Sequence, residues 1–173
     1  ERIDAAWPLE PIGAERPDQG QVFVNGKNVG TLRASEVPYL RRKVGTVFQD
    51  FQLLVKKSVF DNVALPLIVA DTSFKEIDKR VRAALDKVGL LGRERAAPLE
   101  LSVGEQQRVG IARAILHAPD YLMLDEATAS LDEPAEEAVY KLLKTRLHDA
   151  TIVSIGHRST LKAFHDRRLE LVP

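Results

Sequence analysis

The stretch Tyr121-Leu-Met-Leu-Asp-Glu-Ala-Thr-Ala-Ser-Leu-Asp132 decides the fold of this chain. Its first four residues form a short apolar run, which is typical of a buried β-strand. Two adjacent acids, Asp125 and Glu126, follow the run. Because neighbouring side chains of a strand point to opposite faces, the two carboxylates cannot do the same job. Taken alone, the pattern also fits a strand that runs into an acidic surface turn.

After Tyr121 the chain alternates between strand and helix, and one further strand is predicted well before it. Val44 to Phe48 forms an earlier apolar run that predicts a buried strand. Later, apolar residues at helical spacing predict a helix from Pro134 to Leu147, and a second run predicts a strand over Thr151 to Ile155. A short helix from Ser159 and a last strand over Arg168 to Val172 follow. Repeated strand-helix-strand units imply a parallel sheet, with ligand groups collected at the carboxyl ends of the strands.

Residues 50–100 are predicted to be mostly helical. Apolar residues recur at helical spacing after a possible cap at Ser58, and again from Phe74 to Val88, where Gly89 ends the second helix. We therefore expect a helical insertion in the sheet.

The first third of the chain carries less information. Residues 1–18 predict a short helix or loop, because prolines and a glycine interrupt any long period. Gln21 to Asn25 and the following Gly26 predict a small antiparallel hairpin. Ser35 is expected to cap a short helix that runs through Arg42.

Length and composition indicate one domain over residues 1–173, because a chain that is 45% hydrophobic can bury a single core. The 25 basic and 25 acidic residues balance, so no overall field attracts nucleic acid, and none is expected as a partner. The absence of cysteine suits a reducing cytoplasm. No apolar stretch is long enough to cross a bilayer, and no signal peptide is evident.

Leu101-Ser-Val-Gly-Glu105 precedes another helical pattern. Ser102 and Glu105, three residues apart, form a capping box, and the apolar face of the helix follows at Val109, Ala112, Ile115 and Leu116. One interpretation is simply a well-capped helix. The other rests on the same physics, because a helix N-terminus with a hydroxyl and unpaired N–H groups can bind an anion.

Three further polar residues follow or precede predicted elements. Gln49 comes after one predicted strand and His157 after another, so both would lie at the carboxyl edge of the sheet. A lone histidine or glutamine at such a place is more often structural or merely exposed. Asp132 precedes Glu133-Pro134 and would serve as a helix cap.

In this order, the segments Leu101–Arg108, Tyr121–Asp132 and Ile152–Arg158 resemble the second half of an ATP-binding cassette (ABC) ATPase, the nucleotide-driven motor of membrane transporters. The resemblance covers nearly everything from Gln21 onward. It implies an α/β fold: a P-loop NTPase-like parallel sheet with a helical subdomain inserted at residues 50–100. It also implies ATP and Mg²⁺ as ligands.

The resemblance assigns roles at the strand ends. Asp125 and Gln49 would hold Mg²⁺, Glu126 would orient or deprotonate the attacking water, and His157 would contact the γ-phosphate. Glu126 and His157 are therefore the expected catalytic residues.

A second set of roles concerns a dimer of cassettes, either homodimeric or heterodimeric. Ser102, Gly104 and Glu105 match the LSGGQ-like signature that contacts the nucleotide held by the other subunit, with Val103 in place of its first glycine. Asp132 ends a loop at which paired cassettes touch. The family works on the cytoplasmic face of the inner membrane, so a transmembrane transporter or cell-division membrane subunit is the implied partner.

Two subfamilies are evident in different parts of the chain. Four segments look like the bacterial cell-division cassette ATPase that works with a septal membrane protein: Glu36–Lys43, Phe48-Gln-Asp50, Asp61–Leu67 and Ala84–Leu91. Ile155–Leu161 and Phe164-His-Asp166 resemble ATPases fused to peptide or cobalamin-type exporters. A chimera and a single lineage with both features are both compatible with this division.

No G-x-x-x-x-G-K-[S/T] phosphate loop occurs in the 173 residues. In the family this loop directly precedes the segment that resembles Glu15 to Asn25, so we expect the loop and its strand to lie upstream of Glu1. The predicted function is therefore an incomplete ATPase cassette that is coupled to a membrane partner. The alternative is an inactive cassette that acts as a docking or regulatory module.

Overall fold

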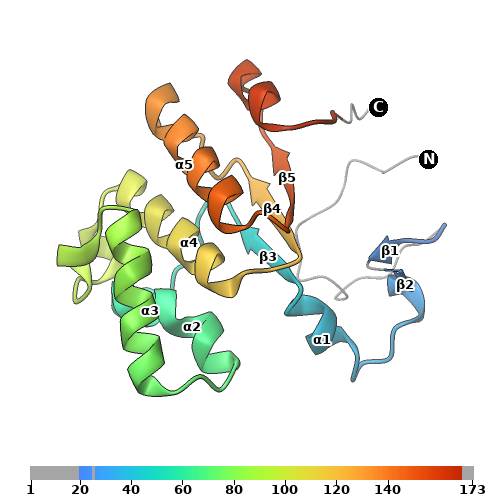
Figure 1. Ribbon diagram of the computed structural model, residues 1–173, viewed down its shortest axis with the longest axis horizontal. Helices are drawn as coiled ribbons and strands as arrows, with labels where there is room; N and C mark the ends of the chain where they lie inside the picture. The colour runs from blue at the N-terminus through green and yellow to red at the C-terminus, as the bar shows by residue number, and fades with distance from the viewer. Residues whose placement is uncertain (1–19, 25, 169–173) are drawn as a thin grey trace.

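A computed structural model describes residues 20–24 and 26–168 of the chain. Its centre is a parallel sheet of β3 (Val44–Val47), β4 (Tyr121–Asp125) and β5 (Thr151–Ile155) in that order. Val47 lies opposite Leu124, and Asp125 lies opposite Ile155. The predicted parallel sheet is confirmed, and its three strands end at a common edge (Figure 1).

Two helices cover one face of this sheet. α4 (Val103–His117) leads into β4, and α5 (Glu133–Arg146) connects β4 to β5. Because right-handed crossovers that step in the same direction along a sheet place their helices on the same side, α4 and α5 lie together (Figure 1). The strand residues beneath them, Val47, Leu122 and Leu124, are almost fully buried.

The other face of the sheet is more open. Val153 and Ile155 on β5 remain 38% and 46% exposed. Within the described residues β5 also pairs only with β4, so its second edge is free.

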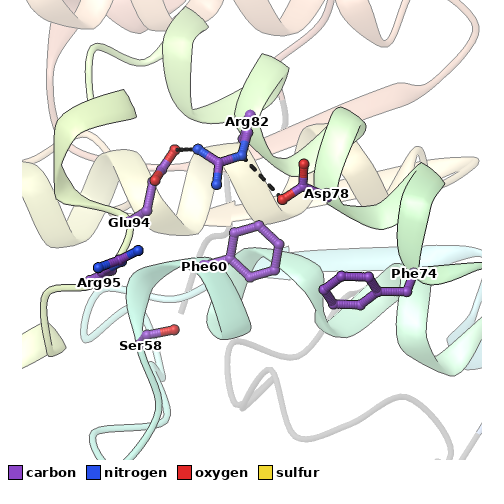
Figure 2. A pocket seen from close by; sticks show the side chains of 7 residues that line it. All are labelled: Ser58, Phe60, Phe74, Asp78, Arg82, Glu94 and Arg95. Atoms are coloured by element: carbon purple, nitrogen blue, oxygen red, sulfur yellow. Dashed lines mark hydrogen bonds and ion pairs between the residues drawn. The ribbon is translucent and has the colours of Figure 1, made fainter.

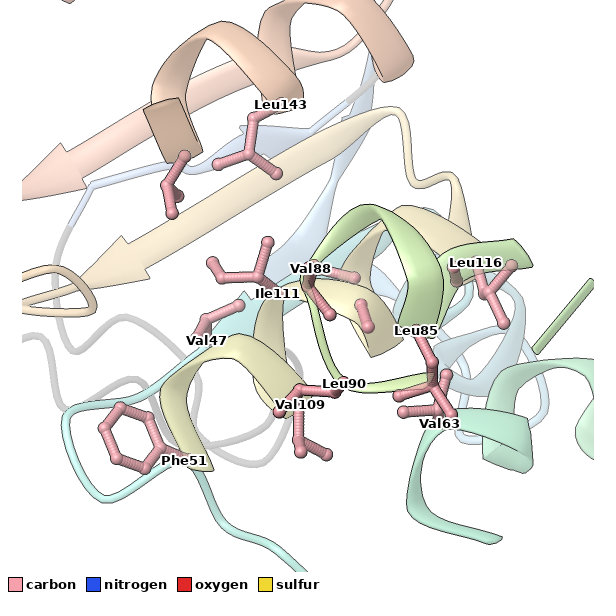
Figure 3. Packing of buried hydrophobic residues seen from close by; sticks show 14 of the residues in the cluster. Val47, Phe51, Val63, Leu85, Val88, Leu90, Val109, Ile111, Leu116 and Leu143 are labelled. Atoms are coloured by element: carbon pink, nitrogen blue, oxygen red, sulfur yellow. The ribbon is translucent and has the colours of Figure 1, made fainter. Parts of the chain in front are cut away.

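Helices α2 (Val59–Val69) and α3 (Phe74–Lys87) pack against α4 on its far side from the sheet (Figure 1). Ser58 caps α2 through a complete capping box with Asp61, and Gly89 adopts a left-handed φ of +70° just after α3, as predicted. Val63, Leu85 and Val109 form one buried cluster between the three helices (Figure 3). Short 3-10 helices at Leu91–Arg93 (η2) and Pro98–Glu100 (η3) lead back to α4.

The region before the sheet contains the predicted hairpin and a short helix. β1 (Phe23–Val24) pairs antiparallel with β2 (Lys27–Asn28), and a 3-10 turn (η1, Val29–Thr31) follows. The prediction that Ser35 caps the next helix is wrong: α1 (Val37–Arg41) begins after Glu36. The Glu36 carboxylate instead accepts a hydrogen bond from the Arg33 backbone N–H at 3.0 Å, and this bond fixes the turn that precedes the helix.

A 3-10 helix, η4 (Ser159–Phe164), closes the described part of the chain. It docks on α5 through Tyr140 and Phe164, whose rings stack with centroids 4.6 Å apart. The predicted last strand lies almost entirely in residues 169–173, outside the described residues, as does the predicted helix or loop over residues 1–18.

Candidate functional site

The parallel register brings the predicted strand-end residues to one edge of the sheet. β3, β4 and β5 end at Val47, Asp125 and Ile155, respectively, and these ends are neighbours in the register. Gln49 and His157 each follow two residues beyond a strand end, and Glu126 follows one residue beyond. The sheet therefore collects Gln49, Asp125, Glu126 and His157 from three separate parts of the sequence.

Glu126 and His157 meet directly. Nε2 of His157 lies 3.1 Å from Oε1 of Glu126, and the two side chains are 91% and 27% exposed. Glu126 adopts a left-handed φ of +46°, an arrangement that costs a non-glycine residue on the order of 1–3 kcal/mol. Its backbone N–H donates to the Ile155 carbonyl at 2.9 Å, and its carbonyl accepts from the Ala129 N–H at 3.0 Å. The tight turn thus holds the carboxylate beside the histidine.

Asp125 occupies a different electrostatic environment from Glu126. Burial and the neighbouring Glu126 carboxylate both raise the pKa of Asp125, burial being the larger cause. A cation at this edge would offset both effects on the pKa of Asp125.

No group of three or more His, Asp or Glu within residues 20–24 and 26–168 is arranged to hold a metal ion. The Asp125 carboxylate and the side-chain carbonyl of the exposed Gln49 are oxygen donors, the kind of ligand that Mg²⁺ takes together with phosphate and water.

At the start of α4, the predicted signature residues form the complete capping box. The Ser102 hydroxyl accepts from the Glu105 N–H at 3.3 Å, while the Ser102 N–H and hydroxyl each donate to Glu105 Oε2 at 2.9 Å. The two bonds that the carboxylate accepts, the one from the Ser102 backbone first, lower the pKa of Glu105. Val103 is 58% exposed, so the residue that replaces glycine in the pattern points its side chain toward solvent.

The loop of residues 127–132 lies beside this first turn of α4. A Cβ at Gly104 would lie 3.9 Å from the Leu131 side chain. Ser130 donates a hydrogen bond of 2.6 Å to Oε1 of the fully buried Gln107. Asp132 caps α5, because its carboxylate accepts from the Ala135 N–H at 2.8 Å. The helix-cap interpretation of both Ser102 and Asp132 therefore holds, whatever else these residues bind.

Sequence reasoning missed a polar cluster behind the site. Glu136, Arg158 and Thr160 join the loop after β4 to the segment after β5 through hydrogen bonds. One signal was available for Glu136: it lies on the same helical stripe as Val139, Tyr140 and Leu143, where an acid is out of place on an apolar face. No periodic pattern in the sequence predicts that Arg158 and Thr160 belong to this cluster.

A separate hollow of about 420 Å³ lies between α2, α3 and the turn at Glu94 (Figure 2). Phe60 and Phe74 line it, and Arg82 bridges Asp78 at 3.1 Å and Glu94 at 2.6 Å along its rim. None of the predicted site residues lines this hollow.

Taken together, these elements define an α/β domain in which Asp125, Glu126 and His157 lie at the carboxyl ends of parallel strands. The chain belongs to the ABC transporter family, whose model matches residues 12–129. It is 48% identical over 132 residues to the cell division ATP-binding protein FtsE of Escherichia coli (strain K12), a match that covers 76% of this chain. It is also 44% identical over 158 residues, 90% of the chain, to the methionine import ATP-binding protein MetN of Rhodopseudomonas palustris (strain BisA53).

The chain spans only part of these relatives, about 60% of the FtsE protein and 43% of the MetN protein. Among solved structures it resembles the ATP-binding cassette MJ0796, in a dimeric post-hydrolysis state bound to ADP and phosphate. The TM-score is 0.80 and the sequences are 30% identical over 93% of this chain and 77% of that one. In residues 20–24 and 26–168, no helix combines the length and the apolar character needed to cross a membrane.

Proposed function

We propose that the chain is the catalytic part of an ABC ATPase that hydrolyses ATP to ADP and phosphate and drives a membrane partner. The observation that carries the proposal is the contact of 3.1 Å between Glu126 and His157, at the edge where Asp125 also ends its strand. An acid and an imidazole that meet at the strand ends can act on one phosphate group and its attacking water.

Each residue of this edge has a distinct role in the proposal. The Glu126 carboxylate accepts a proton from the water whose oxygen attacks the γ-phosphorus, while the bond from that phosphorus to the bridging oxygen of ADP breaks. The His157 ring donates a hydrogen bond to a γ-phosphate oxygen. Asp125 and Gln49 would hold Mg²⁺, which neutralises phosphate charge when bound.

The proposed working form is a dimer of cassettes, either homodimeric or heterodimeric. The dimeric state of the similar MJ0796 cassette supports this form. The N-terminal turn of α4, with Ser102, Gly104 and Glu105, would face the partner's nucleotide, and the loop that ends at Asp132 would contact the partner cassette. The names of the FtsE and MetN relatives support a role in cell division or in import. In either role, the chain would contact a membrane subunit at the inner face of the membrane.

A docking or regulatory module without turnover is the second candidate. The G-x-x-x-x-G-K-[S/T] loop that would cradle the phosphates is not among the 173 residues, so the two candidates must be separated by measurement.

Nucleotide binding and hydrolysis by the purified chain separate the two functions. The ATPase proposal requires Mg²⁺-dependent phosphate release that Glu126→Gln abolishes while ATP affinity stays the same. Glu137→Gln is the matched control, since Glu137 is exposed and its 2.6 Å ion pair is with Lys141 on the same helix. ATP affinity weaker than millimolar, with no phosphate release, would favour the docking module.

A further inference from the structure

The residue after His157 reaches back to the loop that follows Glu126. The Arg158 guanidinium donates from Nη1 to the Leu131 carbonyl at 2.7 Å and from Nη2 to the Ala129 carbonyl at 2.9 Å. A planar guanidinium that donates hydrogen bonds to two carbonyls fixes both the position and the orientation of the loop that carries them. The segment after β5 and the loop after β4 are therefore joined next to their functional residues.

Glu136 forms the second half of the same connection. Its side chain is buried, with 1% of its surface exposed. Oε1 accepts from the Thr128 hydroxyl at 2.7 Å, and Oε2 accepts from the Thr160 hydroxyl at 2.6 Å. Thr128 belongs to the loop after β4, and Thr160 to η4, so one carboxylate holds one residue from each side. Arg158 Nη1 lies 3.9 Å from Oε1 and compensates the buried charge.

We propose that Arg158 and Glu136 are positioning residues that make the Glu126 loop and the His157 segment move as one unit. The proposal gives the Glu126–His157 contact a physical basis. His157 is 91% exposed, so packing does not fix its ring, and the turn at Glu126 is in the left-handed region. The meaning of this unit for ATP hydrolysis rests on the proposed function, but the coupling itself does not.

The coupling has a direct consequence for the loop of residues 127–132. This loop contacts α4 through the hydrogen bond from Ser130 to Gln107. A displacement of the loop, such as docking of a second cassette would cause, is therefore passed through Arg158 to the segment that carries His157. If Arg158 did not hold the loop, a displacement of the loop would not reach the His157 segment.

Amide hydrogen exchange in the whole chain tests the proposal. The Ala129 and Leu131 N–H groups are bonded inside the loop, to the Glu126 and Thr128 carbonyls. Arg158→Ala is expected to speed exchange at these two amides about tenfold or more, while the Leu90 N–H, bonded to the Leu85 carbonyl in the helical region, stays unchanged. Arg158→Lys, which can still donate to one carbonyl, is expected to restore part of the protection.

Arg82→Ala is the matched control. Arg82 also grips two acceptors, Asp78 and Glu94, but lies in the helical region, so the loop amides should keep their protection. Thr160→Val is a milder variant that removes only the hydroxyl bound to Glu136. It replaces Arg158→Ala in the exchange experiment if Arg158→Ala fails to fold. Unchanged loop exchange in Arg158→Ala and Thr160→Val would overturn the proposal. So would an equal rise at every amide, because it would show a purely global effect on stability.

Kinetics then separate this inference from the proposed function. If the chain hydrolyses ATP, Arg158→Ala is expected to lower kcat about tenfold or more with KM for ATP nearly unchanged, because it disturbs alignment and not binding. A wild-type chain without hydrolysis would count against the proposed function only, since the exchange experiment still decides whether Arg158 couples the two segments.

Discussion

The two faces of the central sheet differ in what their side chains do. On the face under α4 and α5, Leu122 and Leu124 of β4 are 0% and 1% exposed. On the other face, Val153 and Ile155 of β5 keep 38% and 46% of their surface, and Asp125 ends β4 beside them. The first face therefore contributes more of the apolar burial that stabilises the fold. The second face supplies less, and Asp125 and Ile155 end their strands on it.

The largest effect should come from the covered face. Leu124→Ala removes a side chain packed in the core and leaves a cavity, which costs about 3 kcal/mol of unfolding free energy. Urea denaturation followed by circular dichroism measures the loss. A loss below about 1 kcal/mol would mean that the helices do not seal this face as tightly as the packing indicates.

A matched pair of substitutions compares the faces directly. Val47→Thr places a hydroxyl among fully buried apolar side chains and should cost about 1–3 kcal/mol. Val153→Thr makes the same change at a residue that is 38% exposed and should stay within about 0.5 kcal/mol of wild type. Both variants keep a β-branched residue in a strand, so the difference between their urea midpoints isolates burial. Equal losses would contradict the assignment of the two faces.

The covered face was predictable because its signals are local. The run Tyr121–Leu124 and the helical spacing around Val109 and Leu143 predict which residues are buried, and the parallel sheet then brings Asp125 near His157. The sequence also identified the capping residue Ser102, yet it failed at Ser35, where a glutamate turn competes with the cap.

The part of the site that escaped prediction depends on contacts between distant segments. Glu136 and Arg158 are 22 positions apart in the numbering, and they meet only because α5 crosses from β4 to β5. Glu126 adopts a left-handed backbone conformation but is neither glycine nor asparagine, the residue types from which such a turn is predicted. Such features follow from tertiary packing, which a periodicity in one segment does not encode.

A weaker effect on the covered side should appear with pH. Burial lowers the pKa of His117, at the end of α4, below its ordinary 6.5, and Arg113 adds to the effect. The unfolded chain then binds more protons than the folded chain, so the unfolding free energy falls as pH drops through about 6.5. Urea denaturation at about pH 7 and about pH 5 measures the slope, which His117→Gln should reduce. An unchanged slope in His117→Gln would assign the pH dependence to other groups.

The smallest effect, and one of opposite sign, is expected at the polar edge. Burial and Glu126 raise the pKa of Asp125, so the folded chain holds the proton more tightly than the unfolded chain. Its contribution to stability is therefore lost as pH rises through the raised pKa, and at neutral pH the charged acid opposes folding. Asp125→Asn should then raise the midpoint of urea unfolding slightly at about pH 7 and flatten its change toward acid pH.

Asp120→Asn is the control for this last comparison, because Asp120 is exposed and forms a 2.9 Å ion pair with Lys43. It should leave the midpoint nearly unchanged or lower it slightly. A loss of stability in Asp125→Asn would show that Asp125 serves the fold. A gain of stability in Asp125→Asn would show that Asp125 weakens folding. A bound cation would then explain an acid at the end of β4 better than packing does.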